Sequence, residues 1–474
     1  MIPEKKTKIV ATIGPATEKE PVFTKLVEAG LNVMRLNFSH GDFAEHQARV
    51  DVCRKVSKKF GVSVAILQDL SGPKIRIGEF GTPNGRITLI PGKAFTITTD
   101  KIVGDENRVS VNYPTLPEEL KVGNMVLLDD GKKRLEVTAI KGNDIVCKVI
   151  IGGDTKGRRG VNLPGAYLKI SSITEKDRKD LEFGIKNKAD FIALSFVRRP
   201  EDILELRGLL TKAKSEAKII AKIETEEAIE NLDAIIDLTD GVMVARGDLA
   251  IEIPAEKVPL IQKRIIARCN ELGKPVITAT QMLESMIKSP VPTRAEVSDI
   301  ANAIIDGTDA VMLSEETTLG EYPIEAVKVM TRVSLEVEKT YDLQRSIEDI
   351  THESPRPVDA VSGAVVHVAE EIGATCIVAL THSGTTARLV SRFKPSQLII
   401  GATPFEKTYN QLALTGNTMP LMVKKTTTLM AAFAEVKKTL LKKKIVEKGD
   451  KVVIIAGLPF SKQVNTNMLV VETI

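Results

Sequence analysis

The stretch Ile219–Glu224 reads IIAKIE and decides the fold class of this chain. A strand that is covered on both faces reads as a continuous apolar run. Here the run is interrupted only toward its carboxyl end, by Lys222 and Glu224. Because alternate residues of a strand point the same way, both charges face the same side. The stretch therefore predicts a buried parallel strand that carries chemistry at its carboxyl end.

Seven other runs of the chain share this pattern and alternate with helical segments. The predicted strands are Lys8–Ile13, Val33–Phe38, Val64–Leu70, Phe191–Val197, Ile219–Glu224, Val242–Arg246, Val276–Ala279 and Ala310–Leu313. Between the last two, Arg294–Asp306 has its apolar residues at helical spacing. Eight alternating units predict a closed (β/α)8 TIM barrel, and an open doubly wound sheet is the alternative.

The alternation breaks in the middle of the chain. From Pro73 to Leu163, short β-branched runs alternate with turn signals, which predicts a small all-β insert without helices. Its ends are Pro/Gly pairs, where we expect a hinge. The polar segment Arg345–Pro357 reads as a linker to a C-terminal α/β domain. We expect a barrel from 1–72 and 164–344, a β-rich lid at 73–163 and an α/β regulatory domain at 345–474.

The C-terminal domain begins with a predicted helix at Val358–Ile372. Its predicted strands are Cys376–Leu380, Leu398–Ile400, Val452–Ala456 and Met468–Val471.

Composition excludes several classes of protein. The 474 residues are 43% hydrophobic and 27% charged, with a net charge of +4 and interleaved signs, so we expect no nucleic-acid partner. No run approaches the roughly 20 apolar residues of a membrane helix, so we expect no membrane partner. The 4 cysteines are far apart, which indicates free thiols in a reducing compartment and a cytoplasmic protein.

Polar residues gather where the predicted barrel strands end, which is where barrel enzymes place their active sites. They are Arg35, Asn37, Ser39, Asp69, Lys222, Glu224, Arg246-Gly247-Asp248, Thr278, Thr280, Gln281, Ser314, Glu315 and Glu316. Glu224 and Asp248 place two carboxylates on neighbouring strands, a set suited to Mg²⁺ or Mn²⁺. A structural ion-pair network is the alternative. Arg35 and Arg76 offer planar forks for phosphate oxygens.

Six ordered motifs resemble pyruvate kinase, and the resemblance covers the whole chain. They are ATIGPAT (Ala11–Thr17), MRLNFSHG (Met34–Gly41), AKIE (Ala221–Glu224), VARGDLAIEIP (Val244–Pro254), TATQMLESMI (Thr278–Ile287) and PTRA (Pro292–Ala295). The resemblance implies phosphoryl transfer from phosphoenolpyruvate to ADP, giving pyruvate and ATP, with Mg or Mn as cofactor. A homotetramer is implied by the family alone.

The resemblance also implies residue roles. Glu224 and Asp248 match metal ligands, and Lys222 matches the lysine that stabilises the transferring phosphoryl group and the enolate. Arg35 matches a phosphoryl contact. Gly247, Asp248 and Thr280 match the region of the substrate carboxylate, while Thr280 and Ser314 lie where the enolate is protonated. The nucleotide phosphates are expected at Asn37, Phe38, Ser39, His40, Arg76 and Arg159.

One departure from the family concerns the monovalent cation. Relatives that need K⁺ have a glutamate at the position of Lys74 and hold the ion near residues matching Asn37, Ser39, Asp69 and the Leu70 carbonyl. An ammonium at Lys74 would oppose K⁺. We therefore expect K⁺ independence, unless Lys74 points to solvent. Ala250 and Glu315 are smaller departures, and the sequence does not assign either a role.

The C-terminal domain has a small-residue loop that resembles the effector site of the family. Its expected contacts to a phosphorylated sugar or nucleotide are Thr381, Ser383, Gly384, Thr385 and Thr386. An N-capping loop without a ligand is the alternative. The segment after Gly457 lacks the glycines that many relatives have there, so the effector stays open.

Two other functions compete with this interpretation. A barrel lyase or aldolase acting on a 2-oxo acid would share the Glu/Asp pair, but not the lid and the Arg35–His40 cluster. A catalytically silent phosphometabolite sensor would use only the C-terminal loop, with Glu315 disabling the barrel.

Overall fold

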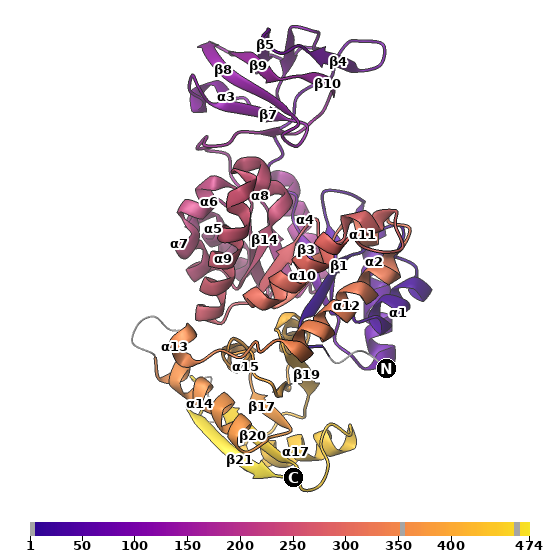
Figure 1. Cartoon of the computed structure of the whole chain (residues 1–474), viewed down its shortest axis with the longest axis vertical. Coiled ribbons are helices and arrows are strands. Elements are labelled where there is room, and N and C mark those ends of the chain that lie inside the picture. The colour runs from indigo at the N-terminus through magenta and orange to yellow at the C-terminus, as the bar shows by residue number, and fades with distance from the viewer. Residues whose placement is uncertain (1–4, 351–355, 459–464) are drawn as a thin grey trace.

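The computed structural model describes residues 5–350, 356–458 and 465–474. Its three parts follow one another along the long axis, with the barrel between the β-rich insert and the C-terminal domain (Figure 1). The expected segments 351–355 of the linker and 459–464 after Gly457 lie outside the described residues. No helix in the described ranges is long and apolar enough to cross a membrane.

Eight parallel strands close into a barrel, as the alternation of the sequence predicts. They are β1 (Lys8–Thr12), β2 (Val33–Asn37), β3 (Ala65–Asp69), β12 (Phe191–Leu194), β13 (Lys218–Ile223), β14 (Gly241–Ala245), β15 (Val276–Ala279) and β16 (Ala310–Leu313). The spatial order is β1-β16-β15-β14-β13-β12-β3-β2, which leaves no free edge. The TIM barrel is confirmed, and the open sheet is excluded.

Helices surround the barrel and bury its outer face. They are α1 (Glu20–Glu28), α2 (Phe43–Phe60), α4 (Glu175–Lys186), α5 (Pro200–Lys212), α6 (Glu226–Glu230), α7 (Leu232–Leu238), α8 (Arg246–Glu252), α9 (Val258–Leu272), α10 (Arg294–Asp306), α11 (Glu315–Thr318) and α12 (Pro323–Thr340). Local signals fix their ends: α10 begins at a capping box of Thr293 and Glu296 and ends at Gly307, whose φ is 102°.

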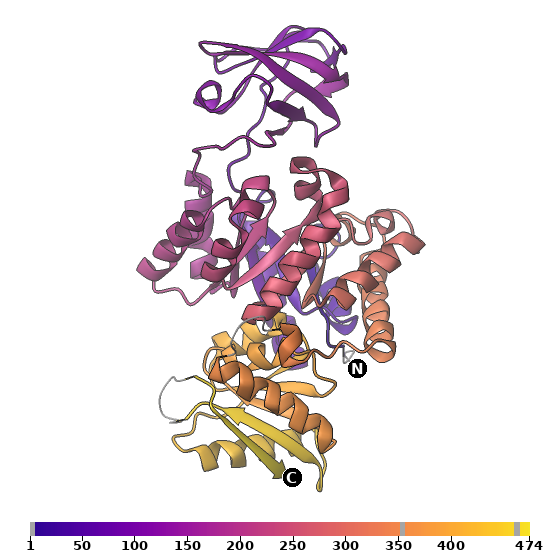
Figure 2. The same cartoon turned by 60° about the vertical axis from the view of Figure 1, so that its left-hand side comes forward.

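The insert between β3 and α4 is built almost entirely of strands. They are β4 (Arg86–Leu89), β5 (Ala94–Thr98), β6 (Arg108–Ser110), β7 (Met125–Leu128), β8 (Lys133–Lys141), β9 (Asp144–Ile151), β10 (Gly153–Lys156) and β11 (Val161–Asn162). The expectation of no helix is wrong in one place, the single turn α3 (Leu116–Glu119). Two chain segments join the insert to the barrel (Figure 2).

The C-terminal domain is a five-stranded sheet with helices packed against it. Its elements are α13 (Ile347–Ile350), α14 (Pro357–Glu371), β17 (Cys376–Leu380), α15 (Thr385–Ser391), β18 (Leu398–Thr403), α16 (Glu406–Gln411), β19 (Thr418–Met422), α17 (Leu429–Lys442), β20 (Lys451–Ala456) and β21 (Met468–Thr473). The strand order is β19-β18-β17-β20-β21, and only β21 is antiparallel. The prediction missed β19, whose central Pro420 is untypical of strands.

The sequence placed several barrel boundaries wrongly. β12 ends at Leu194 rather than Val197, and Arg246 begins helix α8 instead of ending β14. The segment after Thr225 is capped by the side chain of that residue and divides into two helices, α6 and α7, at Asn231. Each error falls at a strand or helix end, where side-chain contacts decide the backbone path.

Three aspartates lie at the base of the barrel, and two of them pair with lysines of the C-terminal domain. Asp190 accepts from Ile66 N at 2.9 Å and pairs with Lys407 of α16 at 3.2 Å. Asp309 accepts from Val276 N at 3.0 Å and pairs with Lys394 at 3.1 Å.

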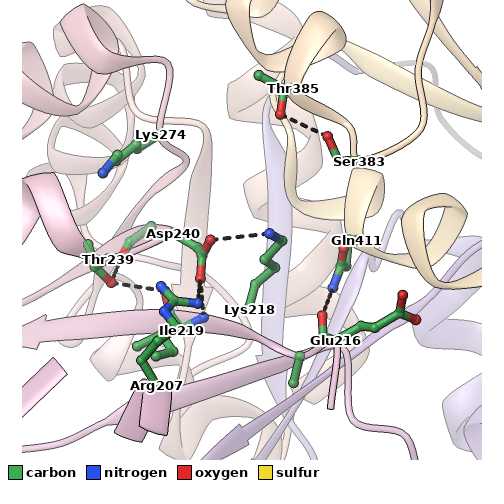
Figure 3. Close-up of polar contacts among 12 residues, drawn as sticks. Arg207, Glu216, Lys218, Ile219, Thr239, Asp240, Lys274, Ser383, Thr385 and Gln411 are labelled. Carbon is green, nitrogen blue, oxygen red and sulfur yellow. Dashed lines mark hydrogen bonds and ion pairs between the residues drawn. The ribbon is translucent and has the colours of Figure 1, made fainter. Parts of the chain in front are cut away.

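The third aspartate is neutralised within the barrel. Asp240 accepts from Ile219 N at 2.9 Å and pairs with Arg207 at 2.6 Å and Lys218 at 3.3 Å (Figure 3). Beside it, Gln411 of α16 donates to the carbonyl oxygen of Glu216 at 2.8 Å, which ties the C-terminal domain to the barrel. The base is therefore a fixed, charge-paired junction.

Candidate active site

Lys222 lies at the centre of the polar cluster at the barrel mouth. Its Nζ is 2.7 Å from Glu224 Oε1 and 3.4 Å from Asp69 Oδ1, and it donates to Ser195 Oγ at 2.7 Å. Burial alone would lower the pKa of Lys222, but the carboxylates of Asp69 and Glu224 raise it above its ordinary value. The site therefore holds a permanent positive charge.

Arg35 adds a second fixed cation from β2. Its Nε is 2.7 Å from Asp69 Oδ2, and its Nη1 donates to Thr12 Oγ1 at 2.7 Å. Burial works to raise the pKa of Asp69, but Lys222 and Arg35 outweigh it and lower that pKa. Asp69 is therefore ionised and orients both cations.

Glu224 and Asp248 are the two carboxylates that the sequence predicts as metal ligands. Glu224 Oε2 accepts from Phe196 N at 2.8 Å, while Asp248 is partly exposed in the first turn of α8. Burial raises the pKa of Glu224, the nearby Asp248 charge raises it further, and Lys222 opposes the shift. Glu224 and Asp248 thus act on each other as like charges.

This donor set fits a divalent cation that keeps several ligand positions for water and substrate. A cation between Glu224 and Asp248 would relieve their mutual repulsion, and hard oxygen donors suit Mg²⁺ or Mn²⁺. Within the described ranges, no three His, Cys, Asp or Glu side chains form a metal cage of their own. Substrate oxygens would therefore have to complete the coordination.

Thr280 is held in a strained conformation opposite α8. Its φ is 68°, a region in which β-branched residues are outliers. Thr280 Oγ1 accepts from Gly247 N at 2.8 Å, and Arg246 Nη2 donates to the Thr280 carbonyl at 2.8 Å. Arg246 is anchored in turn by Asp299 at 2.6 Å. Such strain persists only where its surroundings impose it, which is common in active sites.

The Gly247 amide makes a hydrogen bond within the barrel mouth. Arg246, Gly247 and Asp248 form the first turn of α8. The amide donates to Thr280 and so serves to position that hydroxyl.

Ser314 and the acidic residues after it have different environments. The Ser314 amide donates to Glu316 Oε2 at 2.7 Å, and the buried Glu316 also accepts from Leu283 N at 3.1 Å. Glu316 therefore supports the backbone around Ser314. Glu315 is exposed, although its charge acts on His40.

Two of the predicted phosphate-binding cations, Arg76 and Arg159, lie together with Lys74 at the hinge of the insert. Lys74, Arg76 and Arg159 line a cavity of about 260 Å³ that also reaches Asp248 and Glu252 of α8. Arg76 Nη1 donates to the Arg158 carbonyl at 2.9 Å. The lining of this cavity does not include Lys222, Glu224, Arg35 or Thr280, so it lies to one side of the Lys222 cluster.

The loop at the end of β2 carries the other predicted nucleotide contacts. Asn37 and Ser39 are partly exposed and His40 is exposed, whereas the Phe38 side chain is buried. Burial lowers the pKa of His40, and the charges of Lys74, Arg76 and Arg35 lower it further. His40 thus lies within electrostatic reach of the hinge cations.

The predicted monovalent-cation region is already rich in positive charge. Asp69 faces Asn37 in the register of β2 and β3, but its two oxygens contact Lys222 and Arg35. Lys74 is exposed yet lines the hinge cavity, and desolvation together with Arg76 and Lys222 lowers its pKa.

The C-terminal loop borders a second cavity, of about 860 Å³, that is lined by Thr381, Ser383, Thr385 and Thr386. Ser383 Oγ and Thr385 Oγ1 are 3.0 Å apart (Figure 3), and Gly384 has a φ of 82°. The lining also includes Lys424 and Lys425, which the sequence reading did not select.

Sequence reasoning missed several residues that shape the mouth. Ser195 and Thr12 follow the same strand-end rule as the selected residues, and that rule alone would have found them. Asp299 and Glu252 lie on helices, where nothing in the sequence separates them from solvent-facing acids. Their place in the site is seen only from contacts in the structure: Asp299 pairs with Arg246, and Glu252 accepts a hydrogen bond from Asn162 of the insert.

Comparisons with known proteins agree with this geometry. Residues 4–327 match the family described as pyruvate kinase, barrel domain, and residues 359–472 match pyruvate kinase, alpha/beta domain. The pyruvate kinase of Staphylococcus saprophyticus is 46% identical over 98% of this chain and 80% of its own length. That of Clostridium perfringens is 43% identical over 99% of this chain and 100% of its own length.

A solved structure extends the agreement to the fold. The crystal structure of a pyruvate kinase from Cryptosporidium parvum has a TM-score of 0.93 and 36% identity, and the match covers 99% of this chain and 96% of that one. The likeness therefore spans the barrel, the insert and the C-terminal domain. This chain belongs to the pyruvate kinase family and is a phosphotransferase.

Proposed function

We propose that the barrel mouth transfers a phosphoryl group from phosphoenolpyruvate to ADP, giving pyruvate and ATP as the last step of glycolysis. The observation that carries the proposal is the buried Lys222 ammonium, 2.7 Å from Glu224, with Asp69 contacting both this ammonium and the Arg35 guanidinium. Phosphoryl transfer depends on positioning and charge neutralisation more than on covalent chemistry. Fixed positive charge at this point is what the reaction needs.

Each residue has a proposed role in this transfer. Lys222 and Arg35 neutralise the transferring phosphoryl group, and Lys222 also stabilises the enolate oxygen. Glu224 and Asp248 would hold Mg²⁺ or Mn²⁺, which supplies further positive charge to the phosphoryl oxygens. Thr280, fixed by the Gly247 amide, and Ser314 would orient the water that protonates the enolate.

The hinge cations and the β2 loop would bind ADP. Arg76, Arg159 and the Asn37–His40 loop lie on two sides of the mouth, one set on the insert and one on the barrel. We propose that residues 73–163 form a lid that closes over the nucleotide, because exclusion of water prevents hydrolysis of the transferred group.

We propose further that the enzyme works without K⁺. Support comes from Asp69, whose oxygens already contact Lys222 and Arg35, and from Lys74 in the adjoining cavity. The C-terminal cavity would take a phosphorylated sugar or nucleotide effector, with the hydroxyl loop at the phosphate and Lys424 and Lys425 beside it.

Assembly and compartment are also proposals. Strand β21 is a sheet edge with Val471 47% exposed, which favours pairing with a second copy within a homotetramer. Four buried free cysteines favour a reducing compartment such as the cytoplasm.

The test is direct. Purified protein is mixed with phosphoenolpyruvate, ADP and Mg²⁺, and both pyruvate and ATP are measured; equal amounts of the two are expected. Formation of pyruvate without ATP would indicate a phosphatase, and no reaction would favour a silent sensor. The exposure of Glu315 gives no support to the idea that this residue blocks the barrel.

A further inference from the structure

The side chain of His46 holds the loop that the proposed function assigns to nucleotide phosphate. His46 lies on α2 and is 1% exposed. Its Nε2 is 3.0 Å from the carbonyl oxygen of His40, and its ring stacks on Phe38 with centroids 4.1 Å apart and planes at 13°. One buried side chain therefore contacts both the middle and the end of the Asn37–His40 loop.

The geometry fixes the tautomer of the ring. A carbonyl oxygen only accepts, so Nε2 carries a hydrogen, and in the neutral ring Nδ1 is then the bare nitrogen. Nδ1 is buried and finds no hydrogen-bond partner in the described part of the chain. Burial lowers the pKa of His46 to about 4, Arg49 and Lys176 oppose its protonation, and only the His40 carbonyl and Asp42 favour it. The ring is a neutral donor at physiological pH.

Other contacts restrain the same loop from two further elements. Lys176 of α4 donates to the Phe38 carbonyl at 2.6 Å and pairs with Asp180 at 2.5 Å. The Phe38 amide donates to the Asp69 carbonyl at 3.0 Å. The loop is therefore held at Phe38 by β3 and α4, and at His40 by the His46 ring alone among the side-chain contacts of the described residues.

The sequence of the loop is adapted to the ring beneath it. Gly41 has a φ of 78°, and a Cβ there would lie 3.3 Å from His46 Nε2 and 2.8 Å from Glu45 Oε2. A larger residue would be strained at this φ and would press on both the imidazole and the Glu45 carboxylate. Gly41 and His46 thus form one unit of local structure.

We propose that His46 is a positioning residue for ADP, which acts by holding the His40 carbonyl and the Phe38 ring so that Asn37, Ser39 and His40 face the nucleotide phosphates. The inference rests on the proposed function, because it takes that loop as part of the ADP site. His46 itself does not touch the reacting atoms.

A pair of matched substitutions tests the hydrogen bond. In His46→Gln, the amide nitrogen can reach the position of Nε2, whereas in His46→Asn it reaches only the position of Nδ1. Both variants lose the stacked ring. We expect His46→Asn to raise the KM for ADP about five-fold, and His46→Gln to stay within about two-fold of the unmodified enzyme. The KM for phosphoenolpyruvate should change by less than about two-fold in both.

A second variant keeps the proposal testable if substitutions of the buried His46 prevent folding. Lys176→Met removes the contact to the Phe38 carbonyl from an exposed position and should raise the KM for ADP by about three-fold. Lys179→Met, an exposed lysine on the same helix, is the control and should leave that KM unchanged.

Direct binding of the fluorescent nucleotide mant-ADP separates this proposal from the proposed function. If the unmodified protein binds mant-ADP but makes no pyruvate, the proposed activity is refuted. The role of His46 in nucleotide binding can then still be tested with the same variants. Equal mant-ADP affinity in His46→Asn, His46→Gln and the unmodified protein would overturn the role of His46. Parallel increases in KM for both substrates would also overturn it, because they indicate a general structural effect.

Discussion

The mouth and the base of the barrel both bury aspartates beside basic side chains, but the two ends balance their charges differently. At the base, Asp190, Asp240 and Asp309 each accept from a backbone amide and each pair with at least one cation. At the mouth, Lys222 is shared between Asp69 and Glu224, and Asp248 adds a further negative charge.

The pKa directions express this difference. Burial acts to raise the pKa of Asp240, but Lys218 and Arg207 outweigh it and lower that pKa. Burial and Asp248 instead keep the pKa of Glu224 raised, in spite of Lys222. Burial of charge therefore does not by itself mark function in this barrel. What distinguishes the mouth is the repulsion between Glu224 and Asp248, which a bound cation would relieve.

The largest expected effect comes from removing the cation at the mouth. Lys222→Met should lower kcat by about 10²–10³-fold, because a preorganised charge that acts on the transition state is lost. Because Lys222 is buried beside Glu224 and Asp69, its loss should lower the urea midpoint as well, so kcat is measured on the folded variant. Lys394→Met is the matched change at the base, and it should lower the urea midpoint while leaving kcat unchanged. If Lys222→Met keeps near-normal kcat, the mouth is not the catalytic end.

At the base, a substitution should lower stability and leave kcat unchanged. Asp309→Ala leaves the Lys394 ammonium, whose side chain is 10% exposed, without its carboxylate. Breaking a buried pair costs about 3 kcal/mol of unfolding free energy. Urea unfolding followed by fluorescence or circular dichroism measures the loss, and kcat measured at low temperature should be unchanged. A large loss of kcat without destabilisation would erase the distinction between the two ends.

A change at Lys74 tests whether the mouth supplies its own monovalent cation. KCl, compared with choline chloride at equal ionic strength, should alter the activity of the unmodified enzyme by less than about two-fold. Lys74→Glu should make activity respond to K⁺ by about ten-fold, because a carboxylate attracts the ion that an ammonium repels. Strong activation of the unmodified enzyme by K⁺ would refute the proposal.

The smallest expected effect is the contribution of Glu252 to the pH dependence of the unfolding free energy. Burial raises its pKa from 4.5 to about 7, Glu226, Asp248 and Glu224 add to the shift, and the hydrogen bond from Asn162 opposes it. The folded state thus binds a proton that the unfolded state has lost between about pH 4.5 and pH 7. Stability contributed by this group is complete below about pH 4.5 and is lost as pH rises through 7.

In Glu252→Gln, the difference in unfolding free energy between pH 5 and pH 8 should be smaller by about 1 kcal/mol, after allowance for solvent screening. Urea midpoints at the two pH values measure it, with Glu256→Gln, exposed just after α8, as the control. An equal slope in Glu252→Gln and the unmodified protein would remove Glu252 from the account.

The sequence predicts the barrel well because its information is periodic and local. Each strand is an apolar run with polar residues at its end, and helix ends such as Thr293 and Gly307 carry their own capping signals. The same rule brought Arg35, Asp69, Lys222 and Glu224 to one place. The motifs then identified the family.

Contacts between distant segments could not be predicted in this way. Helix α8 begins at Arg246 because Asp299, 53 residues later, holds its guanidinium beside the Thr280 carbonyl. Likewise, whether the Gly247 amide is free depends on Thr280, whose strained φ no propensity indicates. At the base, Asp309 and Asp190 are paired with Lys394 and Lys407, which belong to another domain. These features follow from packing, which a single sequence does not express.

Binding of Mn²⁺ tests the central contrast most directly, since it needs no turnover. Electron paramagnetic resonance with Mn²⁺ alone should detect one site per chain, which Glu224→Gln and Asp248→Asn weaken by at least about ten-fold. Asp190→Asn and Asp309→Asn at the base should bind Mn²⁺ as the unmodified protein does. Unchanged binding in the mouth variants, or its loss in the base variants, would contradict the account.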